Sequence, residues 1–571
     1  MKAMLKMARP SQRLGGKGGF RMARYCIGID FGSLSGRAAL VDVATGETVA
    51  SSVYDYPHGV MRQRLPDGTP LPDGWALQHP ADYLAVLEHT VPQLLQAAET
   101  DADRVEGIGV DFTSCTVLPV DKAGTPLCML PAYEDRPHAY VKLWQHHGAV
   151  RQAKQMTAAA LATDQRWLTD RFGGVISCES SFPKLWQVLQ EDPALCSAMD
   201  QWVEAGDWIV RCLTGSQTRG GCGAGFKTFY DARTGSYPAD DYFRRLNPIL
   251  ADAVAQKLTA PVLPVGACAG FLTADMAQKL HLRPGIPVAV AHVDAHVCVP
   301  AAGMTRPGQL LAILGTSTCF ITLSRQAQAV PGISGVVWGG VVPGLWGYEA
   351  GQSCTGDMLR WFCENCVPAS CISEAEATGL PLQSYLTRLA ERLRPGESGL
   401  LALDWWNGNR SVLANADLSG LILGLTAQTR PEELYRALIE ATAFGARVIV
   451  ENYRAHGIPV EEFFASGGIS MKNPMAMQIY ADVLHMPVQV PLVGQGPALG
   501  SAIFAAVAAG VYPTVEAATE AMGTRQRAVY TPDARAGQVY DRLYAQYLRL
   551  HDYFGRGENN VMAELRALKN G

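Results

Sequence analysis

The sequence predicts two related α/β domains that face each other. Three observations support this fold class. The chain has 571 residues, well above the ~100–200 residues usual for one domain. Hydrophobic residues make up 48% and charged residues 18% of the chain, a composition that can form sizeable buried cores. Each half also repeats one pattern, in which an apolar strand ends in a loop rich in Gly, Ser and Thr.

The first half opens with a β-meander. An apolar strand is predicted over Tyr25–Asp30, and two more strands over Arg37–Val43 and Ser51–Tyr56 follow across short turns. Short apolar runs separated by turn residues are typical of such a meander. A helix is predicted over Pro80–Ala98 and a buried strand over Val105–Val110.

The second half repeats these elements. Strands are predicted over Pro287–Ala291, Gly308–Leu314, Cys319–Leu323 and Phe463–Ala465. A helix over Pro474–Leu484 has apolar residues at helical spacing. The recurrence indicates that the two halves have similar architecture.

This pattern divides the chain into segments. We expect a first domain over residues 25–284, with an insertion at about 150–245, and a second domain over 285–558, followed by a tail over 559–571. Residues 1–24 contain seven Lys or Arg residues and no Asp or Glu. They fit either a transit peptide or an upstream start codon ahead of Met22. The missing apolar segment favours the start-site interpretation.

Composition also argues against several classes of partner. A formal net charge of −5 gives no electrostatic reason to expect nucleic acid or an anionic membrane. The most apolar run, Ala498–Ala509, is shorter than the ~20 residues of a membrane span. Fourteen scattered cysteines suggest reduced thiols and a cytoplasmic location. The cluster Cys363, Cys366 and Cys371 lacks the fourth ligand that a zinc site requires.

Three loops could bind phosphate. Gly32–Gly36, Gly315–Thr318 and Ser466–Gly468 each follow a strand, where backbone N–H groups and hydroxyls can contact phosphate oxygens. Gly221–Thr228 superficially resembles a P-loop, but Phe226 stands where that motif has its second Gly. No dinucleotide fingerprint follows the first strand either.

Two aspartates are candidate functional residues. Asp30 ends the first strand and could hold Mg²⁺ through water, or it could cap the following turn. Asp294 follows an apolar strand and could act as a general base. If that strand continued, His292, Asp294 and His296 would share one face and could bind a metal, which leaves a hydrolase open as a weaker alternative.

Together these motifs resemble the FGGY family of carbohydrate kinases. Gly28–Ser33 resembles the first phosphate loop of that family, Leu314–Cys319 the second, and Ser466–Pro474 its adenosine-side motif. Gly420–Leu425, followed by two glutamates, is similar to the C-terminal signature. The resemblance runs from about Tyr25 to about Tyr547.

The resemblance implies two ribonuclease H-like domains of the actin and hexokinase type, on either side of an interdomain cleft. It also implies ATP and Mg²⁺ as cofactors, with Asp30 holding the Mg²⁺. The implied ATP-binding residues are Gly32, Ser33, Ser35, Gly315, Thr316, Ser317, Gly467, Gly468 and Asn473. The implied sugar-binding residues are Ser114, Lys227, Asp294 and Glu349.

Further motifs resemble the branch of the family that phosphorylates L-ribulose. They include Gly109–Thr116, Val293–His296, Trp346–Ser353 and Asp404–Arg410. The implied reaction converts L-ribulose to L-ribulose 5-phosphate in L-arabinose catabolism, with Asp294 as general base. A homodimer is one expected assembly.

Two alternative functions remain open from the sequence. D-ribulose or several ketopentoses could be the substrate, since Phe226 and Thr228 beside Lys227 differ from some relatives and could alter the pocket wall. A non-catalytic nucleotide-dependent sugar sensor is the less favoured alternative.

Overall fold

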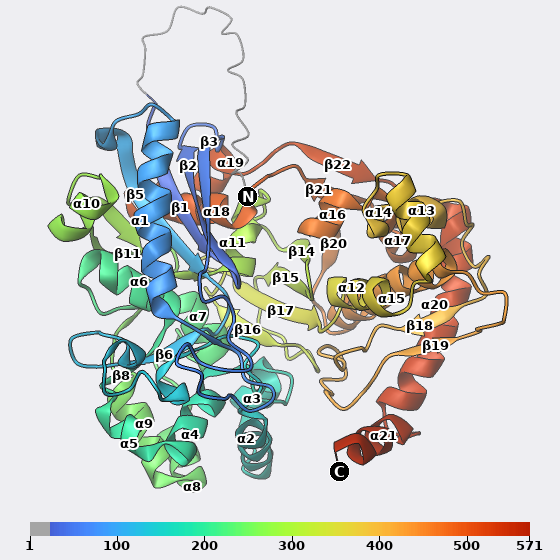
Figure 1. The fold of residues 1–571 in the computed structure, drawn as a ribbon, viewed down its shortest axis with the longest axis horizontal. Coiled ribbons are helices and arrows are strands. Elements are labelled where there is room, and N and C mark those ends of the chain that lie inside the picture. Colours follow the sequence, from blue (N-terminus) through green and yellow to red (C-terminus); the bar gives the residue numbers. More distant parts are fainter. Residues whose placement is uncertain (1–22, 571) are drawn as a thin grey trace, which may run out of the picture.

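The computed structural model describes residues 23–570, so the expectations for residues 1–22 lie outside the described residues. Two sheet-centred domains lie side by side in Figure 1, the first in blue to green and the second mainly in yellow to red. A helical lobe extends from the first domain. This arrangement confirms the predicted α/β fold class.

The first sheet is built around its first strand. Antiparallel neighbours β2 and β3 form the meander on one side of β1, and parallel neighbours β5 and β12 lie on the other. Its strands are β1 (Tyr25–Phe31), β2 (Ser35–Asp42), β3 (Thr48–Asp55), β5 (Val105–Phe112), β11 (Cys268–Phe271), β12 (Pro287–Ala289) and β13 (His292–Val293). Helices α1 (Pro80–Ala97) and α10 (Ala274–Leu280) flank this sheet.

The second sheet repeats that topology. Its central strand β14 pairs antiparallel with β15 and parallel with β20, as β1 does with β2 and β5. Its strands are β14 (Gly308–Leu314), β15 (Thr318–Ser324), β16 (Gly335–Trp338), β17 (Trp346–Gln352), β20 (Val460–Ser466), β21 (Val488–Pro491) and β22 (Arg527–Tyr530).

Helices pack around the second sheet, and two short strands pair beside it. These elements are α12 (Gly356–Asn365), α13 (Ala369–Ala377), α14 (Leu382–Ala390), β18 (Leu401–Leu403), β19 (Leu421–Leu423), α15 (Pro431–Ala455), α16 (Gly468–Lys472), α17 (Pro474–Leu484), α20 (Ala534–Gly555) and α21 (Val561–Asn570). Helix α19 (Val515–Met522) instead packs on α11 (Asp294–Ala301) and α18 (Gly496–Ala508), beside the first sheet. The predicted meander strands and both predicted helices are thus confirmed, with small differences at their ends.

The expected boundary between the domains needs correction. Residues 284 and 285 fall inside the first domain, because β12 and β13 pair with β5 in the first sheet. The apolar stretch Pro287–Ala291 gave no sign that its strand would join the earlier sheet. The chain leaves that sheet only after Val293, where helix α11 (Asp294–Ala301) begins.

The insertion expected at 150–245 is a larger lobe. One hydrophobic cluster joins residues from Met61 to Leu258. The lobe and its junction contain β4 (Leu77–Gln78), β6 (Val117–Val120), β7 (Val141–Lys142), α2 (Val150–Ala162), α3 (Arg166–Arg171), α4 (Ser181–Glu191), α5 (Pro193–Ala198), β8 (Gln201–Glu204), α6 (Ala205–Thr214), β9 (Arg219–Gly220), α7 (Gly221–Thr228), α8 (Asp240–Leu246), α9 (Pro248–Lys257) and β10 (Val262–Leu263).

Two helices pack between the sheets. Helix α18 (Gly496–Ala508) belongs to the second half of the sequence but packs on β1 and β5 of the first sheet, and on α11. Helix α11 contributes to a core cluster with strands of the second sheet. The apolar run that begins at Ala498 is therefore a buried interdomain helix. Within residues 23–570, no helix has both the length and the apolar character needed to cross a membrane.

Glycines allow α18 to approach the sheet closely. A Cβ atom built on Gly28 would lie 1.8 Å from the Ala498 carbonyl oxygen, and one on Gly109 would lie 2.0 Å from that of Ser501. On the other side of α18, a Cβ on Gly500 would lie 2.0 Å from the Val297 carbonyl oxygen. These obstructions are backbone atoms, so a side chain could be accommodated only by moving the helix.

Replacing Gly109 with Ala is expected to lower the free energy of unfolding by at least ~1–3 kcal/mol, the usual cost of overpacking. Urea unfolding followed by circular dichroism measures this loss. Gly494→Ala is the matched control, because a Cβ there meets no atom within 4 Å. Equal stability of the two variants would contradict the proposed close packing.

Candidate active site

A pair of carboxyl groups lies where the first sheet meets its loops. Asp30 on β1 is opposite Asp111 on β5, and both side chains are buried. Arg37 Nε lies 3.3 Å from Asp30 Oδ2, and Ser501 Oγ donates to Asp111 Oδ2 at 2.5 Å. Asp111 Oδ1 has no hydrogen-bond partner among the described residues.

Burial raises the pKa of both carboxyl groups, and that of Asp111 rises well above its ordinary value. Arg37 and a hydrogen bond with Asp111 favour the charged form of Asp30. The proton therefore resides preferentially on Asp111. The Asp30 carboxylate and the unpartnered Asp111 Oδ1 are oxygen ligands of the kind that Mg²⁺ uses in proteins.

The first predicted phosphate loop connects β1 to β2. The Gly32 N–H donates to the Ser35 carbonyl at 3.0 Å. Two residues of the lobe and its junction hold this loop by hydrogen bonds to Ser33. Trp144 Nε1 donates to the Ser33 hydroxyl at 3.2 Å, and Gln78 Nε2 donates to the Ser33 carbonyl at 2.7 Å. The position of this loop therefore depends on residues distant in the sequence.

The second predicted loop, Gly315–Thr318, lies between β14 and β15, and its last residue begins β15. Two carbonyl groups of this loop accept hydrogen bonds from the start of α12. The Gly315 carbonyl accepts from the Gly356 N–H at 3.0 Å, and the Thr316 carbonyl accepts from the Thr355 N–H at 2.9 Å. The Gly315 N–H donates to the Ser317 carbonyl at 3.0 Å. This hydrogen bond closes the turn of the loop.

The third loop lies next to the second. A Cβ on Gly467 would lie 2.5 Å from the Leu314 carbonyl oxygen, so the ends of β14 and β20 are close together. Gly467 has φ +94, a conformation that L-amino acid side chains disfavour. Gly468 begins α16. Asn473 is buried and caps α17, with its Oδ1 accepting from the Ala476 N–H at 3.0 Å.

Two of the predicted sugar-binding residues form a buried ion pair that links the two domains. Lys227 Nζ, on α7 beside the first domain, lies 2.8 and 3.0 Å from the two carboxylate oxygens of Glu349, on β17 of the second domain. Arg410 donates to Glu349 Oε1 at 2.6 Å. His296 Nε2 lies 3.3 Å from Glu349 Oε2.

Burial opposes both charges of this pair, but their mutual attraction outweighs it. Burial favours neutral Lys227, yet Glu349 raises the pKa of its amine. Burial likewise favours neutral Glu349, yet Lys227, His296 and Arg410 hold the pKa of its carboxyl well below the ordinary value. The cluster therefore holds its charged donors and its carboxylate in fixed positions.

Asp294 lies at the first turn of α11, between the two sheets. Its side chain is partly exposed, and Oδ1 accepts from the Ala295 N–H at 2.7 Å. Burial and the nearby charge of Asp30 raise its pKa to about 7. Ser114 lies in the turn between β5 and β6 and is also partly exposed.

One interpretation of the sequence needs correction here. The strand ends at Val293, so His292, Asp294 and His296 do not alternate on one strand face. Within residues 23–570, no group of three or more His, Cys, Asp or Glu side chains is arranged to hold a metal ion. The stretch that superficially resembles a P-loop is helix α7, which carries Lys227 near its C-terminal end.

Three residues of this region were not predicted from the sequence. Arg410 belongs to a noted motif, but nothing in its spacing predicts contact with Glu349. Asp111 also lies in a noted motif, and its position at a strand end was a usable signal. Glu179 is the third, and its Oε1 lies 3.5 Å from His147 Nε2. Burial alone would raise the pKa of Glu179, but this contact and the charge of Arg410 lower it to about 2.

Two matched domains define the class of protein. Residues 25–299 match the N-terminal domain of the FGGY family of carbohydrate kinases, and residues 310–509 match its C-terminal domain. The chain belongs to this family. It is therefore a sugar kinase, an enzyme that transfers phosphate from ATP to a sugar.

Similar proteins support this assignment. The chain is 50% identical over 542 residues to a ribulokinase from Bacillus licheniformis, covering 94% of this chain and 98% of the relative. A ribulokinase from Mycolicibacterium smegmatis is 48% identical over 550 residues, covering 96% and 97%.

Solved structures agree with the fold. The xylulose kinase from Rhodospirillum rubrum has a TM-score of 0.75 at 26% identity, covering 92% of this chain and 98% of its own. The gluconate kinase from Lactobacillus acidophilus has a TM-score of 0.77 at 16% identity, covering 94% and 99%, and shows the fold alone.

Breaking the ion pair of Lys227 and Glu349 is expected to destabilise the protein. Lys227→Met or Glu349→Gln alone should lower the free energy of unfolding by about 3–5 kcal/mol, because the remaining charge stays buried. The double variant should lose less than the sum of the single losses, and chemical denaturation measures all three.

The exposed pair Arg394 and Glu397 is the control for this cycle. Its single variants should each change the free energy of unfolding by less than ~1 kcal/mol. Strictly additive losses at Lys227 and Glu349 would contradict the coupling.

Proposed function

We propose that the enzyme transfers the γ-phosphoryl group of ATP to the C5 hydroxyl of L-ribulose, as a step of L-arabinose catabolism. The observation that carries this proposal is the 50% identity to a ribulokinase over nearly all of both chains. The buried donors and acceptor around Glu349 are compatible with recognition of a small polyhydroxylated substrate.

Asp294 is the proposed general base. A sugar hydroxyl is a weak nucleophile, and a carboxylate within hydrogen-bond reach can accept its proton while the bond to phosphorus forms. A pKa of about 7 suits this role, because a base works best when its pKa is near the working pH. The start of a buried helix also limits movement of the carboxylate.

The nucleotide is proposed to bind along the three loops. The proposed contacts are Gly32, Ser33, Ser35, Gly315, Thr316, Ser317, Gly467, Gly468 and Asn473. The exposed loop after β14 and the partly exposed loop after β1 support this assignment. Asn473 is the weakest member of the set, since its side-chain oxygen already caps α17.

Asp30 is proposed to hold Mg²⁺ through water, with Asp111 beside it. A bound Mg²⁺ would neutralise charge on the transferred phosphate. The chain's own contribution is to keep the negative charge on Asp30 through Arg37 and the hydrogen bond with Asp111.

Lys227, Glu349 and Ser114 are the proposed sugar contacts. Lys227 and Glu349 already pair with each other, and Arg410 holds the Glu349 carboxylate in place. A sugar hydroxyl would add a hydrogen bond to this fixed ionic cluster. The many buried, free cysteines are compatible with the proposed cytoplasmic location.

D-ribulose, or ketopentoses in general, is the alternative substrate class. Phe226 beside Lys227 packs against His296, with 4.4 Å between ring centroids, so it shapes the wall next to Glu349. ADP release with Mg-ATP and L-ribulose, D-ribulose, L-xylulose, D-xylulose or glycerol separates the two proposals. Preferential turnover of L-ribulose supports the first. Equal turnover of several ketopentoses supports the second, and no sugar-dependent turnover refutes both.

Asp294→Asn is expected to lower turnover by at least ~10²-fold, the low end for loss of a general base. Sugar binding should be largely kept, because the amide still offers an oxygen to the substrate. Steady-state kinetics and calorimetric titration with sugar measure the two quantities. Near-normal turnover would remove Asp294 from the base role.

The activity is also expected to depend on pH. Protonated Asp294 cannot accept a proton, so kcat/KM for the sugar should fall about tenfold per pH unit below a pH of about 7 and level off above it. A pH series at saturating ATP measures this profile, with circular dichroism as a check on folding. A flat profile between pH 5 and 8, in protein that stays folded, would count against the assignment.

A further inference from the structure

A buried lysine of the lobe bonds two segments of the proposed active site. Lys184 lies on α4, and its side chain is fully buried. Its Nζ donates to the Cys115 carbonyl at 2.8 Å and to the Leu143 carbonyl at 3.0 Å. Cys115 follows β5 and Leu143 follows β7, so this one amine ties the ends of two strands to the helical lobe.

The first of these segments is the turn that carries Ser114, a proposed sugar contact. The next residue, Cys115, has φ +49, a left-handed conformation that is unfavourable for a residue with a Cβ atom. Such a conformation persists only where surrounding contacts hold it. The bond from Lys184 is one such contact, and the hydroxyls of Thr113 and Thr116, 2.7 Å apart, form another. The position of Ser114 therefore depends on Lys184.

The second segment leads to the first phosphate loop. Trp144 directly follows Leu143, and its Nε1 donates to the Ser33 hydroxyl at 3.2 Å. The next turn of α4 supports the same segment, because Gln187 Oε1 lies 2.8 Å from His146 Nε2. The Leu143 carbonyl also accepts from the His146 N–H at 2.9 Å. The lobe thus contacts the nucleotide side through α4 and this short segment.

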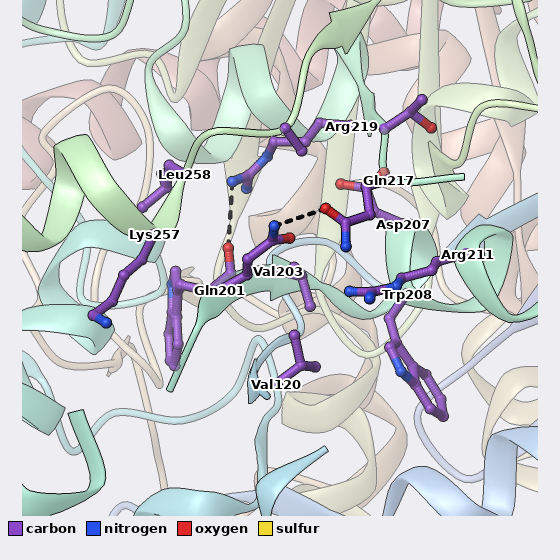
Figure 2. Close-up of a pocket in the computed structure, with 13 residues that line it drawn as sticks. Val120, Gln201, Val203, Asp207, Trp208, Arg211, Gln217, Arg219, Lys257 and Leu258 are labelled. Atoms are coloured by element: carbon purple, nitrogen blue, oxygen red, sulfur yellow. Dashed lines mark hydrogen bonds between the residues drawn. The ribbon is translucent and has the colours of Figure 1, made fainter. Parts of the chain in front are cut away.

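Helix α4 is itself held in place by buried polar contacts. At its start, the Ser181 hydroxyl accepts from Trp202 Nε1 at 2.9 Å. Trp202 lies on β8, which borders the pocket in Figure 2. The Trp202 carbonyl accepts from Nη1 of Arg219, a buried residue labelled in that figure, at 3.3 Å. The helix therefore gives the amine a fixed support.

A second buried lysine of the lobe makes no such connection. Lys142 on β7 is also fully buried, but its Nζ has no hydrogen-bond partner among residues 23–570. The amine lies 4.5 Å from the centroid of the Trp75 ring, and burial lowers the pKa of Lys142 to about 7. Of these two buried lysines, only Lys184 joins segments of the site. Lys184 has no exposed surface with which to touch a substrate, so any effect on the reaction must act through these segments.

We propose that Lys184 is a positioning residue for both substrates. It fixes the Ser114 turn against the sugar and, through Trp144 and Ser33, the first phosphate loop against the nucleotide. This inference rests on the proposed function, which supplies the roles of Ser114 and Ser33. Because one amine holds both segments, it also sets how the sugar hydroxyl meets the transferred phosphate, and small misplacements of reacting groups are costly in rate.

Lys184→Met removes the amine and keeps a side chain of similar length. KM for the sugar and KM for ATP should each rise about tenfold, the effect of losing one hydrogen bond, and kcat should fall as well. Steady-state kinetics with each substrate varied measures these changes, on the sugar that the wild type phosphorylates best. A merely structural role would lower kcat through a smaller folded fraction. Two unchanged KM values would therefore overturn the proposal.

Lys142→Met is the matched control, because it makes the same replacement at a buried lysine that bonds neither segment. It should keep both wild-type KM values. An equal rise of both KM values in this variant would also overturn the proposal, since any altered lysine of the lobe would then distort the site.

Trp144→Phe tests the connection to the phosphate loop alone. It removes the bond to Ser33 and keeps an aromatic ring, so KM for ATP should rise about tenfold while KM for the sugar stays at the wild-type value. An unchanged KM for ATP would refute this connection.

Two further measurements cover failure of folding or of turnover. If Lys184→Met does not fold, Lys184→Gln keeps one donor in the same space, and at least one KM should still rise; two unchanged values would refute the proposal. If the wild type phosphorylates no sugar, the proposed function fails. Calorimetric titration with Mg-ATP then tests Lys184 separately, because Kd should rise about tenfold in Lys184→Met and stay unchanged in Lys142→Met. Equal Kd values in all three proteins would contradict the positioning role.

Discussion

The packing of α11 against α18 between the two sheets is the constraint on which the rest of the structure depends. Helix α18 rests on a glycine-lined face of β1 and β5, and α11 rests on α18. Because the contacts are backbone to backbone, the separation of the layers has little freedom. The start of α11 is thereby fixed near the ends of β1 and β5. Asp294 and Asp30 come close enough to affect each other's charge without any direct bond.

Buried charge is stabilised in different ways on the two sheets. On the first sheet, Asp30 and Asp111 lie together, and burial raises the pKa of Asp111 so far that its carboxyl holds a proton while Arg37 favours the charged form of Asp30. On the second, Glu349 is surrounded by Lys227, Arg410 and His296 and stays ionised. The Asp30 and Asp111 pair can therefore gain or lose a proton, whereas the Glu349 carboxylate stays charged. That division suits a reaction in which one group accepts a proton and others hold the substrate.

Much of the fold could be predicted from the sequence because its signals are local. Alternation, turn residues and apolar runs are readable within a few residues, and each strand that ends in a Gly-rich loop was found. The boundary after residue 284 was misplaced because β12 is apolar in either sheet, and only its pairing with β5 decides where it belongs. The supposed strand face of His292, Asp294 and His296 failed because nothing in the sequence marks the helix that begins at Asp294.

The site was predicted unevenly for a related reason. Lys227 and Glu349 came from the resemblance to a family, whereas Arg410 and Lys184 are distant in sequence from the groups they bond. The two carbonyls that Lys184 joins can be recognised only once the surrounding chain has been placed. Motifs reveal groups that relatives share, and packing reveals the groups that hold those motifs in position.

The crossing of α18 into the first domain also bears on synthesis of the chain. Val293 completes the first sheet, yet the helix that covers the glycine face of β1 and β5 does not begin until Gly496. At about 5–20 residues per second, the ribosome needs about 10–40 s to make the intervening segment. During that interval the nascent first domain exposes an apolar, side-chain-poor surface. Residues 25–299 expressed alone would keep that surface exposed permanently, so the two halves are related in architecture but are not independent folding units.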